Sequence, residues 1–368
     1  MQFVHIADNH LGYRQYNLDE RERDIYRAFE ECIEKIIEIK PDFVVHSGDL
    51  FEHSEPSVNA LYTAMEGFKR LKDHGIQIYM IHGNHDKPKR DFKKSPFTVL
   101  KSVLGDYFRT FTKKKYHIFE KGGKEVFIGG NDFTSRSNVD TLHKTYRMIE
   151  AVSKDYRDRI LLFHQSIYSY SNLPTYEIQL EDLPKGFKYY AGGHIHQRIL
   201  KRVGEGYIAY SGSTEIYTYD EYEDYEKNGK GFYLVDISGE GCDVEKIDIR
   251  CRDFVVEKAI TDEESFKRFL EKLNSKKEPV VVCSVLRELA EKLERVLKSK
   301  KTLYNRITYL DKVSEEEILE ISHMDVEEVF REFLRRRNYD VDFVYGIYSQ
   351  VVKGGNLHKY LEDYLRNF

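Results

Sequence analysis

The sequence predicts an α/β protein in which sheets pack as a sandwich and helices flank them. From residue 2 to residue 81, strand-length apolar runs alternate with stretches whose apolar side chains recur at helical spacing. That alternation is typical of parallel strands joined by helical crossovers. Beyond residue 105 the apolar runs are shorter and follow one another closely, which indicates further strands. With 368 residues, the chain is long enough for more than one domain.

Three strands and two helices are expected in the first part of the chain. The strands are predicted at residues 2 to 8, 43 to 47 and 76 to 81, and the helices at residues 19 to 39 and 57 to 75. Pro41 ends the first helix, because proline lacks the amide hydrogen that a continuing helix needs. This alternation of strands and helices therefore predicts a parallel sheet whose strands are connected by helices.

The middle of the chain predicts more strands around one long helix. Strands are expected at residues 116 to 119, 126 to 129, 159 to 163, 189 to 191, 199 to 203, 207 to 210 and 231 to 237, and the helix at residues 139 to 152. We assign residues 1 to 250 to this first domain.

Two smaller units are expected after it. Strands at residues 254 to 259, 279 to 285 and 303 to 310 alternate with helices at residues 262 to 273 and 288 to 297, which predicts a small α/β domain over residues 251 to 312. Residues 313 to 368 predict short helices with apolar faces. Their periodicity leaves two alternatives open, packing on their own domain or docking on a partner.

Composition indicates a cytoplasmic protein with a highly charged surface. The longest apolar runs are strand-length and far below a membrane span, and the first residues show no secretory signal. The four cysteines form no Cys-x-x-Cys pair, so we expect reduced thiols, with a bond between Cys242 and Cys251 as the alternative. The net charge of −5 does not indicate a nucleic-acid binder, so local clusters must carry that interpretation.

Seven polar residues lie at or just past the ends of predicted strands. They are Asp8, His10, Asp49, Asn84, His164, His194 and His196. Ligands of open α/β sheets gather beyond the carboxyl ends of strands, so these side chains are expected to converge. Within Asp8–His10 and His194–His196 the residues are two apart, and on extended backbone both side chains of a pair face the same way. Any one of them alone is commonly structural, but the full set favours a metal site.

The number of donors predicts two ions. Two carboxylates, one amide and four imidazoles exceed one tetrahedral shell and suit two ions that share a carboxylate, for which Asp49 is the candidate. Nitrogen and oxygen donors without a thiolate suit Mn²⁺, Fe²⁺ or Zn²⁺. Two divalent cations outweigh two aspartates, so the site attracts phosphate esters and activates bound water. The sequence therefore predicts a hydrolase.

These motifs resemble those of the calcineurin-like metallophosphoesterases. That pattern reads Asp-x-His, Gly-Asp, Gly-Asn-His with Asp or Glu, His, and Gly-His-x-His, and residues 1 to 237 contain all of it. Residues 5 to 13, 47 to 51, 189 to 196 and 210 to 213 are most similar to archaeal nucleases of the Mre (meiotic recombination eleven) family, which repair DNA double-strand breaks. The resemblance implies a four-layer core, a cap that contacts DNA and a C-terminal helical module.

The resemblance also implies roles for individual residues. One Mn²⁺ would be held by Asp8, His10, Asp49 and His196, and the other by Asp49, Asn84, His164 and His194. His85 would stabilise the transition state and protonate the leaving oxygen, which suits a side chain with a pKa near neutrality. Some family members carry a phosphate-steering histidine where this chain has Glu52, and whether His53 replaces it is open.

A basic segment behind His85 provides candidate phosphate or DNA contacts. It contains Lys87, Lys89, Arg90, Lys93 and Lys94, and a second cluster contains Lys113, Lys114 and Lys115. Such runs are usually solvated surface. Beside a phosphodiester-cleaving centre, however, lysine and arginine would bind a nucleic-acid backbone without reading its sequence.

The resemblance implies a DNA nuclease that is a 3′ to 5′ exonuclease on double strands and an endonuclease on single strands. It further implies a homodimer formed by helices of the first hundred residues, and an SMC-like coiled-coil ATPase of the Rad-fifty type bound by the C-terminal helices. Two alternatives are a metallophosphoesterase that acts on phosphoproteins or small nucleotides, and a non-catalytic scaffold with this fold. The first is disfavoured because residues 48 to 53 lack an Asp-Arg-Gly continuation, and the second because no ligand or acid is missing.

Overall fold

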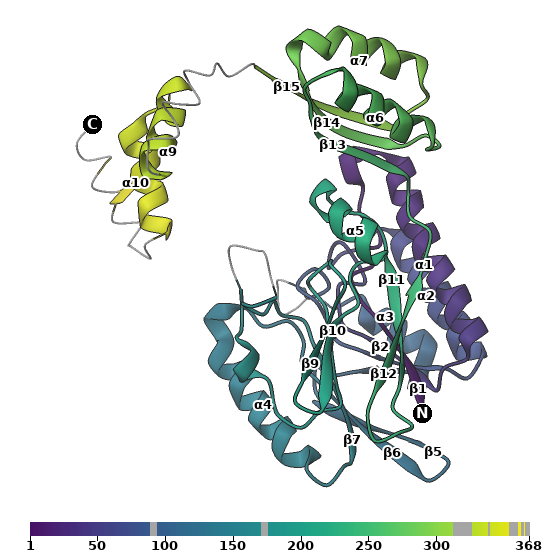
Figure 1. Ribbon diagram of the computed structural model, residues 1–368. Helices are drawn as coiled ribbons and strands as arrows, with labels where there is room; N and C mark the ends of the chain where they lie inside the picture. The colour runs from purple at the N-terminus through teal and green to yellow at the C-terminus, as the bar shows by residue number, and fades with distance from the viewer. Residues whose placement is uncertain are drawn as a thin grey trace.

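Two sheets lie face to face in the computed structural model, with helices outside both (Figure 1). The structure describes residues 1–88, 94–170, 176–311, 326–337 and 339–352, together with residues 360, 361 and 364.

The first sheet has six strands, four of which are parallel. In spatial order they are β12 (Asp243–Asp248), β11 (Gly231–Asp236), β1 (Gln2–Ile6), β2 (Phe43–His46), β3 (Gln77–Met80) and β4 (Phe108–Thr110). β1 to β4 run parallel, while β11 and β12 form an antiparallel edge. The outer face is covered by α1 (Asp19–Ile39), α2 (Val58–Asp73) and α3 (Phe97–Leu104). Ser57 begins α2, because its side chain accepts a hydrogen bond from the Ala60 amide.

The second sheet also has six strands. In spatial order they are β5 (Tyr116–Lys121), β6 (Lys124–Gly130), β7 (Asp158–Phe163), β8 (Tyr189–Gly192), β10 (Gly206–Tyr210) and β9 (Ile199–Val203). The four inner strands are parallel and the two edge strands antiparallel. α4 (Val139–Ser153) covers the outer face with Leu142, Tyr146 and Ile149.

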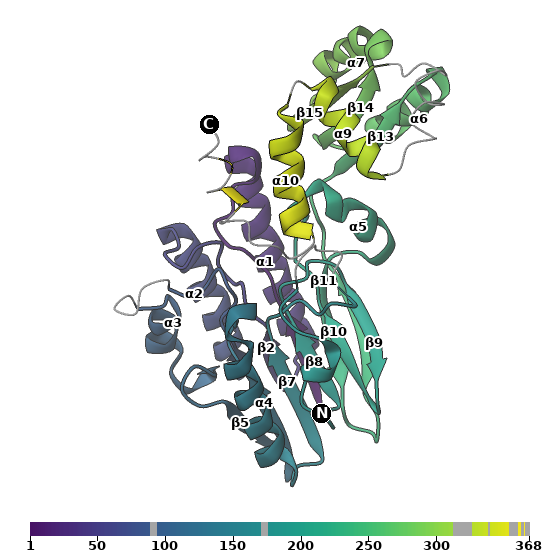
Figure 2. The ribbon, with the colours of Figure 1, turned by 90° about the vertical axis from the view of Figure 1, so that its left-hand side faces the viewer.

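The inner faces of the two sheets meet in an apolar layer. Phe3, Phe43 and Val45 of the first sheet pack with Ile128 and Leu162 of the second, and all five are buried. The layers therefore follow the order α/β/β/α (Figure 2). The predicted α/β sandwich is confirmed.

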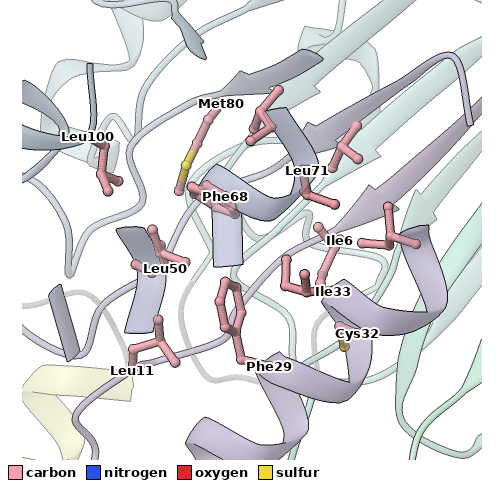
Figure 3. Packing of buried hydrophobic residues seen from close by; sticks show 14 of the residues in the cluster. Ile6, Leu11, Phe29, Cys32, Ile33, Leu50, Phe68, Leu71, Met80 and Leu100 are labelled. Carbon is pink, nitrogen blue, oxygen red and sulfur yellow. The ribbon is translucent and has the colours of Figure 1, made fainter. Parts of the chain in front are cut away.

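Two buried leucines anchor the loops that follow β1 and β2. Leu11 and Leu50 are almost fully buried and share one cluster with Phe29 of α1 and Phe68 of α2 (Figure 3). The Leu11 amide donates to the Leu50 carbonyl at 2.9 Å. Because each leucine directly follows a predicted metal ligand, the core holds the two loops side by side.

A third sheet is formed by β13 (Phe254–Ile260), β14 (Val280–Leu286) and β15 (Tyr304–Leu310), all parallel. α6 (Glu263–Asn274) and α7 (Arg287–Ser299) cover one face. This three-stranded sheet and its helices contact the two-sheet sandwich through an apolar cluster that contains Ile216, Tyr222 and Phe254. Tyr16 of the sandwich also stacks on Tyr304 of β15, with ring centroids 4.0 Å apart. Farther along the chain lie α9 (Val326–Arg336) and α10 (Val341–Val352).

Several short elements are not predicted by the sequence pattern. They are α3, β4, β12, α5 (Tyr222–Asn228) and the 3-10 turns Gln15–Asn17, Gly105–Tyr107, Arg136–Asn138, Leu180–Asp182 and Tyr219–Glu221. Most are too short to show a periodic pattern, and no residue of β12 is fully buried. The neighbours on which they pack decide their conformation.

All four cysteines are free, as expected, and they are buried, so the alternative bond between Cys242 and Cys251 is absent. Among the described residues, no helix is long and apolar enough to cross a membrane.

Candidate metal centre

The seven predicted ligands lie in loops at the carboxyl ends of five strands from both sheets. Asp8 and Asp49 follow β1 and β2, and Asn84 follows β3 in the first sheet. In the second sheet, His164 follows β7 directly, and His194 lies two residues beyond β8. The site therefore lies where the two sheets meet, with the strand-end placement that the sequence predicts.

Four of these residues have positive φ, so the extended-backbone argument for the ligand pairs is wrong. Asp8 has φ 53°, His10 46°, Asp49 53° and His194 86°. Such angles are uncommon outside glycine, although aspartate and histidine tolerate them better than most residues. Strained backbone of this kind clusters at functional sites. Tight turns, and not extended strands, therefore aim these side chains.

Two glycines of the motifs allow the loops to approach one another. A Cβ on Gly83 would lie 2.0 Å from Asp49 Oδ1, and a Cβ on Gly193 would lie 2.2 Å from the Ser47 carbonyl oxygen. Any side chain at either position would separate the loops. The glycines beside Asn84 and His194 are therefore required for the assembly of the site.

Asp8, His10 and His196 form the first group of donors. One candidate ligand atom from each lies within 4.8 Å of the others. The Nε2 atoms of His10 and His196 are 3.1 Å apart. Asp8 is fully buried and accepts from the His194 amide at 3.0 Å. Three such donors around one point can hold a divalent cation.

Asp49, His164 and His194 form the second group, again within 4.8 Å. His164 Nε2 lies 3.1 Å from both Asp49 Oδ2 and Asn84 Oδ1. Asp49 Oδ2 is also 3.8 Å from His10 Nε2, so this carboxylate lies between the two groups. His194 and His196 belong to different groups although only one residue separates them.

The outer nitrogens of three imidazoles have acceptors that turn the inner nitrogens toward the centre. His10 Nδ1 donates to Glu52 at 2.8 Å, His196 Nδ1 to Glu221 at 2.9 Å, and His164 Nδ1 to the Ser47 carbonyl at 2.7 Å. Metal-bound histidines typically show this arrangement, because it selects one tautomer and one ring orientation. The donor set therefore fits two divalent cations.

The charges of the site favour cation binding. Burial alone would raise the pKa of Asp49, but His164 and His10 hold it well below its ordinary value, so the carboxylate is ionised. Burial lowers the pKa of His194 to about 3, which keeps it in the neutral form that binds metals. Burial would also lower the pKa of His164, but Asp49 and Asp8 raise it to about 9. A cation held by His164 would therefore have to displace a proton from this imidazole.

Glu221 forms a buried ion pair behind His196. Lys230 Nζ lies 2.5 Å from Glu221 Oε2, and both side chains are buried. Burial would raise the pKa of Glu221, but Lys230 and His196 hold it well below its ordinary value. Glu221 is therefore an anionic acceptor for His196 at neutral pH, which the sequence pattern did not reveal.

His85 lies beside both groups without belonging to either predicted ligand set. Its ring centroid is 4.8 Å from that of His10, and its amide donates to Asp49 Oδ1 at 2.9 Å. Nδ1 donates to the Glu52 carbonyl at 2.8 Å, which leaves Nε2 as the nitrogen available for proton transfer. The side chain is 35% exposed, so solvent can reach it.

Comparison with known proteins decides the family. The model of the calcineurin-like phosphoesterases matches residues 1–198. The DNA double-strand break repair protein Mre11 of Methanococcus maripaludis is 46% identical over 100% of this chain and 99% of its own length. The protein of the same name from Methanocaldococcus jannaschii is 43% identical over 99% of this chain and 98% of its own length. The chain belongs to the Mre11 family. It is a metal-dependent phosphoesterase.

Asp86 is a further residue of this Mre11-family site to which the sequence pattern assigned no role. Its buried carboxylate accepts from the amides of Leu50, Phe51 and Gly83 at 3.3, 2.9 and 3.0 Å. Burial raises its pKa to about 6, with the charge of Asp49 acting in the same direction. Asp86 therefore joins the loop that carries Asp49 to the loop that carries Asn84. Its position two residues after Asn84 was the feature of the sequence that could have indicated a role in the site.

The candidate DNA contacts of this Mre11-family chain are only partly described. Lys87 and Lys94 are exposed, while Lys89, Arg90 and Lys93 lie outside the described residues. His53 is exposed next to Glu52. Burial would raise the pKa of Glu52, but His10, His85 and, least of the three, His53 lower it below its ordinary value.

Proposed function

We propose that the protein is a two-metal DNA nuclease that processes DNA ends in double-strand-break repair. The observation that carries this proposal is the convergence of seven oxygen and nitrogen donors into two adjacent groups with His85 beside them. Relatives that match almost the whole chain are named for DNA double-strand break repair. We assign it 3′ to 5′ exonuclease activity on double strands and endonuclease activity on single strands.

We assign Asp8, His10, Asp49 and His196 to one Mn²⁺, and Asp49, Asn84, His164 and His194 to the other. The bound ions would polarise the phosphodiester and provide a hydroxide near neutral pH. His85 would donate a proton from Nε2 to the leaving oxygen, because Nδ1 is already occupied by the Glu52 carbonyl.

The substrate would be bound through its phosphates. Exposed Lys87 and Lys94 flank the segment that contains Lys89, Arg90 and Lys93, and all five follow the His85 loop. We assign the unit of residues 251 to 312 to a second DNA contact. Contacts to phosphate make binding salt-dependent and independent of sequence.

Incubation of the Mn²⁺-loaded protein with linear DNA and with a phosphopeptide tests this function. We expect cleavage of DNA and none of the peptide. Activity on the peptide alone would favour the phosphatase alternative, and activity on neither would favour a binding scaffold. Labelled ends on one duplex would show the polarity of cleavage.

A homodimer is proposed through α2 and α3, which pack against each other on the outer face of the first sheet. Val58 and Tyr62 of α2 are 84% and 59% exposed, and Val99 and Val103 of α3 are 42% and 36% exposed. An apolar surface of this kind is typical of a protein interface.

The substitution Tyr62→Asp is expected to convert the dimer into a monomer, because it places a charge in that apolar interface. Light scattering after size-exclusion chromatography measures the mass. The matched control is Tyr168→Asp, which alters a residue that is 66% exposed elsewhere on the surface. A dimeric Tyr62→Asp protein would show that the interface lies elsewhere.

The C-terminal helices are proposed to bind an SMC-like coiled-coil ATPase of the Rad-fifty type. Phe333 of α9 and Tyr348 of α10 are 50% and 42% exposed, so apolar surface is left for a partner. We assign residues 313 to 368 to this module, of which the structure describes residues 326–337, 339–352, 360, 361 and 364.

Deletion of the residues after 314 is expected to abolish binding of the ATPase and to leave metal-dependent DNA cleavage intact. Calorimetry with the ATPase and a nuclease assay on the same preparation measure both properties. If cleavage is lost as well, the helices belong to the catalytic core.

A further inference from the structure

A third group of titratable side chains lies against the metal centre. Candidate ligand atoms of His10, Glu52 and His85 are within 4.8 Å of one another. Taken alone, this spacing would also suit a third cation. The hydrogen bonds of the group argue for a different role.

The two ring nitrogens of His10 face different partners. Nδ1 donates to Glu52 Oε2 at 2.8 Å, whereas Nε2 lies 3.1 Å from His196 Nε2 and 3.8 Å from Asp49 Oδ2. Glu52 therefore lies behind the imidazole and not among the inner donors. A carboxylate in this place orients a ligating histidine and increases its basicity.

The main chain of Glu52 connects the other two loops of the site. Its carbonyl accepts from His85 Nδ1 at 2.8 Å, and its amide donates to the Leu11 carbonyl at 3.1 Å. His10 and His85 are thus held by the side chain and the backbone of the same residue. The second contact does not depend on the identity of the side chain.

The Glu52 carboxylate has fewer positively charged neighbours than the Glu221 carboxylate. Among the ion pairs of the described residues, Glu221 faces buried Lys230, whereas the partners of Glu52 are His10 and His85. Within the part of the chain that the structure describes, the negative field at His10 therefore comes from a carboxylate that no lysine or arginine pairs with. Such a field strengthens the attraction of a cation at the inner nitrogen.

We propose that Glu52 is a positioning residue that holds His10 in the tautomer and orientation needed to bind the metal ion on the Asp8 side. The inference rests on the proposed function for the identity of the ions and deepens it. The ligand set proposed for the second ion, which includes Asn84, contains neither His10 nor Glu52. Loss of the Glu52 carboxylate is therefore expected to weaken metal binding at only one of the two sites. The hydrogen bond from His85 Nδ1 is accepted by the backbone carbonyl of Glu52 and survives substitution, whereas the Glu52 carboxylate lies farther from His85 Nδ1, at 3.8 Å.

Titration of metal-stripped protein with Mn²⁺ in a calorimeter tests the proposal. The parent is expected to bind two ions. Glu52→Ala is expected to lose about 10- to 100-fold in affinity at one site and to keep the parental affinity at the other. Glu52→Gln retains an acceptor oxygen without the charge, so its loss should be smaller. Glu125→Ala, at an exposed position on β6, is the matched control and should match the parent.

Restoration of nuclease activity by excess Mn²⁺ distinguishes a positioning role of Glu52 from a catalytic one. Nuclease activity of Glu52→Ala is expected to return to within a few-fold of the parent at saturating Mn²⁺, because the His85 contact is intact. Parental Mn²⁺ affinity in both variants would overturn the proposal. So would a third bound ion in the parent that Glu52→Ala removes, since Glu52 would then be a ligand itself.

Two checks keep the result interpretable. Circular dichroism of the metal-stripped proteins shows whether each variant is folded; if Glu52→Ala is not, the nearly isosteric Glu52→Gln carries the test. If the parent binds two Mn²⁺ ions but leaves DNA intact, the proposed substrate is wrong, while the calorimetric comparison still decides the role of Glu52.

Discussion

Replacing Asp49 by asparagine is expected to weaken both metal sites and to reduce phosphodiesterase activity to background. Asp49 Oδ2 lies 3.1 Å from His164 Nε2 and 3.8 Å from His10 Nε2, so it is the carboxylate between the two groups. Asparagine preserves the volume and removes the charge. Since loss of a partner outside the ligand shell already costs about 10- to 100-fold in metal affinity, loss of a shared ligand should cost more.

Calorimetric titration with Mn²⁺ and a nuclease assay at saturating metal measure the two consequences. Asp155→Asn is the matched control, because Asp155 is exposed beyond α4 and should leave both properties unchanged. If Asp49→Asn bound one ion with parental affinity, the carboxylate would belong to one site, and the bridging role would be wrong.

Replacing His85 by alanine is expected to lower the rate constant of DNA cleavage by about 10²- to 10⁴-fold, the range for loss of a general acid. Both ions should remain bound, because His85 contributes no atom to the Asp8 or the Asp49 group. Single-turnover assays at saturating Mn²⁺ give the rate constant, and calorimetry gives the metal content. Excess metal should not restore the activity, in contrast to Glu52→Ala.

His74→Ala provides the control for the loss of an imidazole, since His74 is exposed at the end of α2. A His85→Ala protein that cleaved DNA at the parental rate would show that another group protonates the leaving oxygen. A variant that had lost an ion would show that His85 supports the metal centre.

Much of the fold follows from local sequence because its main elements are long and regular. The period of apolar residues predicts α1 over residues 19 to 39, and the structure has the helix at Asp19–Ile39. Element β4 has three residues, and β12 has no buried face, so neither contains enough pattern to be recognised. Their conformations depend on strands already in place.

The supporting residues of the site were harder to foresee than its donors. Glu221 reaches His196 from 25 positions away and is paired with Lys230, and nothing in the local sequence of either marks the contact. Glu52 was noted only as a departure from a family pattern. Such residues are selected by three-dimensional proximity, which a single chain does not show.

The sequence by itself determined the chemical class of the site, because the donor types and their placement after apolar runs are local properties. The tertiary structure decided how the donors are divided. His10 and His196 are 186 positions apart yet share one group, whereas His194 belongs to the other group with Asp49 and His164. Positive φ angles at Asp8, His10, Asp49 and His194 turn these side chains, and the meeting of two sheets brings them together. Both effects arise from packing between distant segments, which no local pattern specifies.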